Sequence, residues 1–199
     1  MRRSVLVLTV AVVGLLSAAG GVAMAQLTLP IRGDQLREVA VVQLANDTYT
    51  YSENWRDIPG ASVTITNETL NDELVLARFN GQSLCHGGYG GGHCFVWIVT
   101  ETPNGEQTPM PPQFGPRGSA FDSSANGDWE MHSMDRAAVL EGAGSNPPTP
   151  ATYTVKAQWR HSGAATVCGG FGCDDRPFFG LDDYSLTVER VKWVRNPPS

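Results

Sequence analysis

The sequence predicts an all-β protein, an antiparallel β-sandwich with jelly-roll character, and three observations carry this prediction. Several segments alternate apolar and polar residues with a period of two, as half-buried strands do. Glycine and proline, 22 and 13 of the 199 residues, gather between these segments. No window after the first 25 residues keeps the 3.6-residue apolar period of a helix. Strands joined by Gly/Pro turns indicate two packed antiparallel sheets.

Residues 1–25 have the pattern of a signal peptide. A short basic region precedes an apolar run over residues 5–13, and the small residues Ala23 and Ala25 stand before a cleavage site at Gln26. The apolar run is shorter than the roughly 20 residues that a membrane-spanning helix needs. We therefore expect a secreted, extracellular protein that is not inserted into a membrane after cleavage.

The charge of the chain argues against nucleic acid as a partner. The whole sequence has 14 basic and 20 acidic residues and a formal net charge of −6. Two of the basic residues, Arg2 and Arg3, leave with the signal peptide, so the mature chain has 12 basic and 20 acidic residues and a net charge of −8. A mildly acidic surface without a basic surplus disfavours anionic partners.

Behind the signal peptide we expect a lead-in over residues 26–35, a single β-sandwich domain over 36–195 and a short tail over 196–199. Strands are expected, in chain order, at residues 37–44, 48–51, 61–66, 74–79, 95–99, 129–134, 152–160 and 184–193.

Three of these strands have patterns that say how they are buried. Residues 152–160 alternate most clearly, which is typical of a strand with one face in the core. Residues 74–79 and 95–99 are nearly continuous apolar runs, so we expect central strands covered on both faces. In residues 184–193 the apolar phase changes, which a bulge or a change of neighbouring strand near Arg190 would explain. Strand positions also predict that Trp97, Trp159 and Trp193 belong to the core.

Four cysteines in an exported chain predict two disulfides, with three pairings open. The spacing favours Cys85 with Cys94 and Cys168 with Cys173, each pair enclosing a glycine-rich loop. A bridge between Cys85 and Cys168 would close a much larger ring and constrain the unfolded chain more. Local pairs are expected mainly to hold the two loop tips.

Candidate binding residues lie inside or beside these loops. Tyr89 and Phe171 stand within the glycine-rich segments, where no strand pattern would bury them, and exposed aromatic rings can stack on sugars or anchor in a partner. The alternative is that both rings fold back onto the sandwich. His86 and His93 flank the first loop and are candidate binding residues too. With their neighbouring cysteines they also form a zinc-like set, although the oxidising compartment favours a disulfide.

A calcium site is a second candidate. Asp122, Ser124, Asn126 and Asp128 alternate along residues 122–128 as ligands do in a calcium loop, and Gly127 has the place of the tight turn. Ser133 stands where such a loop has its bidentate Glu, and a polar turn at Asn126-Gly127 is the alternative interpretation. No other cofactor is expected.

Catalytic motifs give no support for an enzyme. The sequence has no G-x-S-x-G, HExxH, P-loop or Rossmann pattern, and the adjacent acidic pairs at 174–175 and 182–183 are typical of solvated turns. A hydrolase that uses two carboxylates is the alternative. Asn46 and Asn67 begin N-glycosylation patterns.

Three stretches of the chain together resemble a known group of proteins. They are residues 74–79 with 85–99, residues 119–136 with the phrase Trp129-Glu130-Met131-His132-Ser133-Met134-Asp135-Arg136, and residues 153–159 with 181–191. In strand rhythm they are similar to secreted bacterial β-sandwich proteins with C1q/TNF-like jelly-roll character. The resemblance implies a jelly roll and trimeric or extracellular binding, and brings no catalytic residues.

Taken together, these patterns predict a secreted, disulfide-stabilised binding or adhesion module. Its expected target is a carbohydrate or a cell-surface protein. The alternatives are an extracellular hydrolase that depends on carboxylates and a structural subunit of an envelope or matrix. A homo-oligomer is compatible with each of them.

Overall fold

The computed structural model describes residues 36–68, 71–87, 92–112, 119–123, 128–142, 150–162 and 177–192. These ranges contain ten strands and no helix. The strands are β1 (Leu36–Leu44), β2 (Thr48–Thr50), β3 (Arg56–Asn67), β4 (Glu73–His86), β5 (His93–Glu101), β6 (Gln107–Pro109), β7 (Ala120–Ser123), β8 (Glu130–Leu140), β9 (Ala151–Ser162) and β10 (Phe178–Lys192).

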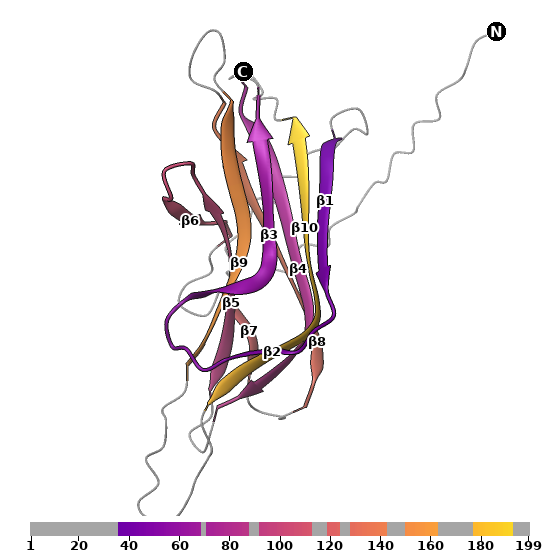
Figure 1. Cartoon of the computed structure of the whole chain (residues 1–199), viewed down its shortest axis with the longest axis vertical. Coiled ribbons are helices and arrows are strands. Elements are labelled where there is room, and N and C mark those ends of the chain that lie inside the picture. The colour runs from indigo at the N-terminus through magenta and orange to yellow at the C-terminus, as the bar shows by residue number, and fades with distance from the viewer. Residues whose placement is uncertain are drawn as a thin grey trace, which may run out of the picture. The chain divides into compact units, whose positions relative to one another are not determined.

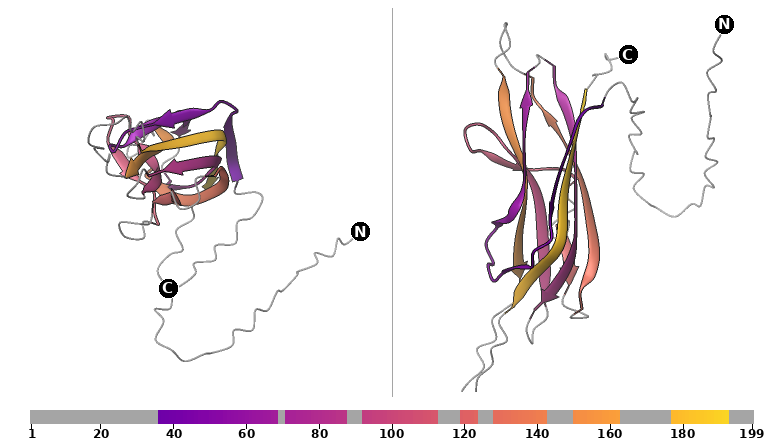
Figure 2. Two further views of the ribbon diagram at one scale, coloured as in Figure 1. Left: turned by 90° about the horizontal axis from the view of Figure 1, so that it is seen from below. Right: turned by 45° about the vertical axis from the view of Figure 1, so that its right-hand side comes forward.

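The strands form two antiparallel sheets that face each other (Figure 1). Sheet A has the order β1-β10-β4-β8, with β2 pairing with β10 at one end, and sheet B has the order β3-β9-β5-β6, with β7 also pairing with β5. Strands from the first half of the chain pair with strands from the second half, as in a long hairpin wrapped into a jelly roll. Figure 2 shows the two layers along and across the strands. The predicted fold class is confirmed.

The core lies between the two sheets and consists of the side chains on the inward face of each strand. In β9 the predicted inward face is confirmed, because Val155, Ala157 and Trp159 all belong to the core. β5 is buried on both faces, as its continuous apolar run predicts. The same prediction for residues 74–79 is wrong. Arg78 on β4 is exposed and the burial of this strand alternates, because sheet B covers one face of sheet A while the other face is open.

Tyr184 on β10 crosses the core and links the two sheets. Its ring is buried, and its hydroxyl donates a hydrogen bond of 2.8 Å to the carbonyl of Pro59 on β3. The Cβ atom of Tyr184 lies directly against Gly81 on β4, where an added Cβ atom would be only 2.9 Å from it. A side chain at residue 81 would therefore push Tyr184 out of place.

Near Arg190 the irregularity lies in the partner strand β1, whose register shifts between Leu36 and Glu38, opposite Val191 and Arg190, and not in β10. This strand keeps its register with β4 from Ser185 to Lys192, so Arg190 lies opposite Val75 and faces the core. It takes part in an ion pair with the buried carboxylate of Glu73, at 3.5 Å, and donates to the carbonyl of Thr66. The apolar phase changes because a charge pair replaces apolar residues at this end of the core. The register shifts lie between residues 36 and 38 of β1 and between residues 182 and 185 of β10.

The Cys85–Cys94 disulfide is confirmed, with a Cα–Cα distance of 5.7 Å, but its position differs from the expected one. Cys85 is on β4 in sheet A and Cys94 is on β5 in sheet B, and both residues are buried in the core. The bond therefore joins the two sheets through the core and does more than hold a loop tip. Cys168 and Cys173 lie outside the described residues.

The double substitution Cys85→Ala with Cys94→Ala should lower the free energy of unfolding by about 2–5 kcal/mol, because it removes both the cross-link and buried sulfur from the core. Urea unfolding at equilibrium, followed by tryptophan fluorescence, measures this change. A loss below about 1 kcal/mol would contradict a role of this bond in joining the sheets.

Candidate functional site

Aromatic side chains gather on the outer face of sheet A, at the end where β2 pairs with β10. We call this group the aromatic patch, and it consists of Tyr49, Tyr51, His86, Trp129 and Phe178. Its rings are in contact. Measured between ring centroids, Phe178 lies 5.8 Å from Tyr49, 6.2 Å from Tyr51 and 5.2 Å from His86, on which it stacks. The centroids of Tyr49 and Trp129 are 6.4 Å apart. Segments far apart in the sequence thus build one continuous surface.

The strand register explains why these rings meet. Gly180 on β10 lies opposite Tyr49 on β2 and opposite Leu84 on β4, while Phe178 lies opposite His86. Residues directly opposite each other on antiparallel strands share a face of the sheet. Position 180 carries no side chain, and the space above it is occupied by the neighbouring rings.

Gly180 lies directly beneath the rings of the patch. A Cβ atom at this position would lie 2.9 Å from the ring of Tyr49 and 3.2 Å from the ring of Trp129. The first distance is shorter than real Cβ contacts and the second is tighter than most of them, so the two rings can approach the strand this closely only because residue 180 is a glycine.

The patch is open to solvent. Tyr51 is 63% exposed, Tyr49 45% and Trp129 39%, and the neighbouring Met131 is 64% exposed. Desolvation and the nearby Asp47 carboxylate raise the pKa of Tyr49, so its hydroxyl stays protonated. That hydroxyl contacts Asp47 at 3.5 Å. The patch therefore combines apolar rings with polar groups at its rim.

The predicted binding residues have different outcomes. His86 is part of the aromatic patch, and Tyr89 and Phe171 lie outside the described residues. His93 lies on the outer face of sheet B, where its ring meets Phe95 at 6.2 Å. The two histidines follow and precede cysteines that point into the core, so they project from opposite faces of the sandwich.

The alternative interpretation of Cys85, His86, His93 and Cys94 as a zinc-like ligand set is therefore wrong. Its two thiols form the disulfide, and its two histidines are separated by the sandwich. No local pattern in the sequence marks Tyr49, Tyr51, Trp129 and Phe178 as a group, because what brings them together is the pairing of strands far apart in the chain.

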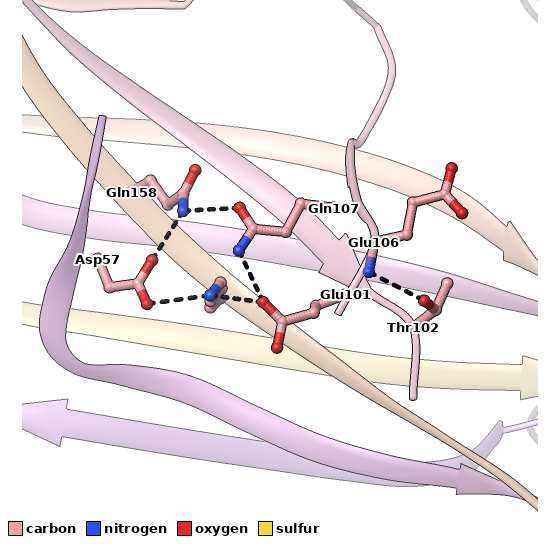
Figure 3. A network of polar contacts seen from close by, with 7 residues as sticks. Asp57, Glu101, Thr102, Glu106, Gln107 and Gln158 are labelled. Carbon is pink, nitrogen blue, oxygen red and sulfur yellow. Dashed lines mark hydrogen bonds and ion pairs between the residues drawn. The ribbon is translucent and has the colours of Figure 1, made fainter. Parts of the chain in front are cut away.

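A closed ring of polar contacts covers the outer face of sheet B (Figure 3). Lys156 on β9 binds Asp57 at 2.9 Å and Glu101 at 2.7 Å. The amide of Gln107 donates to Glu101 at 2.7 Å, and the amide of Gln158 donates to Gln107 at 3.0 Å and to Asp57 at 2.7 Å. The ring ties β3, β9, β5 and β6 together across the sheet.

The ring also sets the protonation of its members. Partial burial alone would raise the pKa of Asp57, but hydrogen bonds from Gln158 and Lys156 outweigh it and hold this pKa below its usual range. Hydrogen bonds from Lys156 and Gln107 lower the pKa of Glu101. Burial of Lys156 acts to lower its pKa, and the two carboxylates overcome this and raise it. All three groups are charged at neutral pH.

Beside this ring, an aromatic and cationic stack lies on the same face. Trp55 stacks on Trp97 with their centroids 3.9 Å apart, and the guanidinium of Arg160 lies 5.0 Å from the ring of Trp55 and 4.8 Å from that of Phe95. Trp97 is therefore half-buried on the outer face, and its predicted place in the core is wrong. Trp159 is in the core as predicted, and Trp193 lies outside the described residues.

The predicted calcium loop stays a prediction, and one of its residues, Asp122, belongs to a different group. Asp122 lies on β7 with its side chain 6% exposed, and one of its oxygens accepts a hydrogen bond of 2.7 Å from Ser83. Asp122 lies close to Glu130 and His132 of β8. Each of the three residues has one atom able to ligate a metal, and these three atoms lie within 4.8 Å of one another. Asp128 is exposed and is not a member of this group, while Ser124 and Asn126 lie outside the described residues.

Two further features complete the surface. A groove of about 410 Å³ lies on the outer face of sheet A, beside the exposed ion pair of Arg78 with Asp135. Of the two glycosylation patterns, Asn46 is exposed, whereas Asn67 is fully buried and its amide donates to the carbonyls of Asn71 and Glu141. Asn67 therefore serves the fold, and an attached glycan would not fit there.

Replacing Lys156 with Met should lower the free energy of unfolding at pH 7 by about 1 kcal/mol, because its carboxylate partners are partly exposed and screened by solvent. Their folded-state pKa values are lowered, so in the wild type this stabilisation is present above pH about 4 and is lost as the pH falls further. The difference between variant and wild type should therefore shrink in acid, as urea unfolding at pH 7, 4 and 3 will measure.

The matched control is Arg78→Met, which removes a cation from a pair whose side chains are both more than half exposed. It should leave stability nearly unchanged at each pH. An equal loss in the two variants, or a difference for Lys156→Met that does not vary with pH, would contradict the role assigned to the ring.

Comparisons with known proteins do not assign the chain to a family. No family model matches it, and no curated protein matches it. A structure of infectious bursal disease virus, Gx strain, is similar with a TM-score of 0.39 and 14% identity over 90% of this chain and 39% of the other. A CocE/NonD family hydrolase from Staphylococcus aureus is similar with a TM-score of 0.27 and 10% identity over 79% of this chain and 34% of the other. Among the described residues, no helix is long and apolar enough to span a membrane.

Proposed function

We propose that the protein is a secreted carbohydrate-binding module and that its ligand lies on the aromatic patch of sheet A. The observation that supports this proposal best is the set of exposed, mutually contacting rings around Gly180. A pyranose ring has an apolar face of C–H groups, which packs on the face of Tyr or Trp and leaves the sugar hydroxyls free for polar contacts.

The arrangement of the patch suits such a ligand. Its rings are held by their neighbours in edge and stacked contacts, so little side-chain freedom is lost when a ligand binds. Asp47, the Tyr49 hydroxyl and Gln82 on β4 stand at or near its rim and can receive or donate hydrogen bonds. A platform on paired strands is also more rigid than one on loops.

The substitutions Tyr49→Ala and Trp129→Ala should each weaken glycan binding about tenfold or more, equivalent to about 1.4 kcal/mol per tenfold. Gly180→Ala should have a similar effect without removing a ring, because its Cβ would displace both. Calorimetric titration with soluble oligosaccharides of glucose and of N-acetylglucosamine, and pull-down on cell-wall glycan, measure the change.

Val41→Ala is the control, because Val41 is exposed on the same outer face but lies on β1. The double substitution Tyr89→Ala with Phe171→Ala tests whether the two loop aromatics extend the site. A wild type that binds none of these glycans overturns the proposal, as does unchanged binding in all three patch variants.

A second candidate function, self-assembly into a structural subunit, is favoured by a separate observation. Val39 and Val41 lie side by side on β1, the edge strand of sheet A, and both are about half exposed on its outer face. Exposed apolar side chains on one face are typical of a surface that associates. If the chain assembles through this face, Val39→Asp with Val41→Asp should convert an oligomer into a monomer in light scattering. A wild type that is a strict monomer at high concentration contradicts assembly.

A further inference from the structure

The group of Asp122, Glu130 and His132 lies where the two sheets meet at an open side of the sandwich. Asp122 belongs to β7, which pairs with β5 of sheet B, and the other two residues belong to β8 at the edge of sheet A. In the register, Glu130 lies opposite Ser83 of β4, and His132 lies opposite Gly81. Glu130 and His132 therefore turn toward the space between the sheets, and Asp122 reaches the same place through its hydrogen bond with the buried Ser83.

The distances within this group match the ligand spacing of a small metal ion. The Nε2 atom of His132 lies 3.7 Å from Oδ1 of Asp122 and 3.5 Å from Oε2 of Glu130. A tetrahedral ion with bonds of about 2.0–2.2 Å to nitrogen and oxygen ligands separates those ligands by about 3.4 Å. Both observed distances are longer than a hydrogen bond should be.

A second observation points to a missing partner at this place. The Nε2 atom of His132 is shielded from solvent and has no hydrogen-bond partner within the described part of the chain. A buried polar nitrogen without a partner is costly. Two carboxylate oxygens stand beside it, one of them on a side chain that is 94% buried, so a cation there would satisfy the nitrogen and both negative charges.

The surroundings hold the ligands as metal sites commonly do. Asp122 receives hydrogen bonds from the Ser83 hydroxyl at 2.7 Å and from the backbone N–H of Ser123 at 2.6 Å, which fix the orientation of its carboxylate. The ring of Phe121 packs against the imidazole of His132 at 5.5 Å. Such outer contacts orient the direct ligands of a metal and tune its affinity.

We propose that Asp122, Glu130 and His132 bind one divalent transition-metal ion of the Zn²⁺ type between β7 and β8. The imidazole ligand selects against Ca²⁺ and Mg²⁺, which prefer all-oxygen sites with more ligands. Three protein ligands leave a fourth position on the side of Glu130, whose side chain is 44% exposed, and water can fill it. This site is independent of the aromatic patch, which lies on the outer face of sheet A.

Zinc binding to the untagged, secreted protein tests this proposal. After treatment with EDTA and dialysis, titration calorimetry with Zn²⁺ should show one ion per chain with a Kd of about 10 µM or tighter, and millimolar Ca²⁺ should give no such binding. Zinc should raise the Tm, because it binds the folded state preferentially. In nitrogen-detected NMR, addition of Zn²⁺ should shift the Nε2 signal of His132.

Variants separate this site from adventitious binding. His132→Gln and Asp122→Asn should weaken Zn²⁺ binding at least 100-fold, and Ser83→Ala about tenfold, because Ser83 only orients a ligand. His93→Gln is the matched control, since this exposed histidine lies on the outer face of sheet B, and its Kd should equal that of the wild type. Glu130→Gln, at the most exposed ligand, should weaken binding at least tenfold and serves if the more buried substitutions unfold the chain.

Two results would overturn the proposal. One is a wild type that binds no Zn²⁺ at 1 mM and whose NMR spectrum shows His132 protonated on both nitrogens, which would make the group an ion pair of imidazolium with two carboxylates. The other is an unchanged zinc affinity in folded Glu130→Gln and His132→Gln, which would place the ion elsewhere.

Discussion

Side chains alternate across each strand of the sandwich, and the space between the two sheets receives only one of the two faces. Large rings such as those of Phe79, Phe179 and Tyr184 fill this space and exclude water. Because burial of these apolar surfaces stabilises the fold, the inward positions are committed to packing. The outward positions are free of this packing constraint and can carry other side chains. The aromatic patch on sheet A and the polar ring on sheet B both use this freedom.

Strand β8 and the residue before it show how one segment serves two purposes. Trp129 and Met131 point to the outer face, where Trp129 contacts Tyr49, while Glu130 and His132 turn inward beside Asp122. A shift of one residue in the pairing with β4 would exchange the two sets. The contacts that fix the sheets relative to each other, among them the Cys85–Cys94 bond, therefore also preserve both candidate sites.

Buried and partly buried charged groups of the protein lie near partners of opposite charge. Arg190 meets Glu73 at the end of the core, and Lys156 lies between two carboxylates on sheet B. Isolated buried charges are costly, and a partner of opposite sign reduces that cost. By the same reasoning, the neighbouring carboxylates beside His132 call for a positive charge, which a metal ion or a protonated imidazole supplies.

Local patterns in the sequence were sufficient for the all-β class, for most strands and for the Cys85–Cys94 pair, because strand alternation and short cysteine spacing are properties of neighbouring residues. They did not reveal the short strands β6 and β7, the solvent exposure of one face of β4, or the inward position of Arg190. The aromatic patch and the group at Asp122 were equally hidden. Each depends on which distant strands pair and in which register, and only the tertiary structure decides that, because the core rewards one arrangement of the two sheets as a whole.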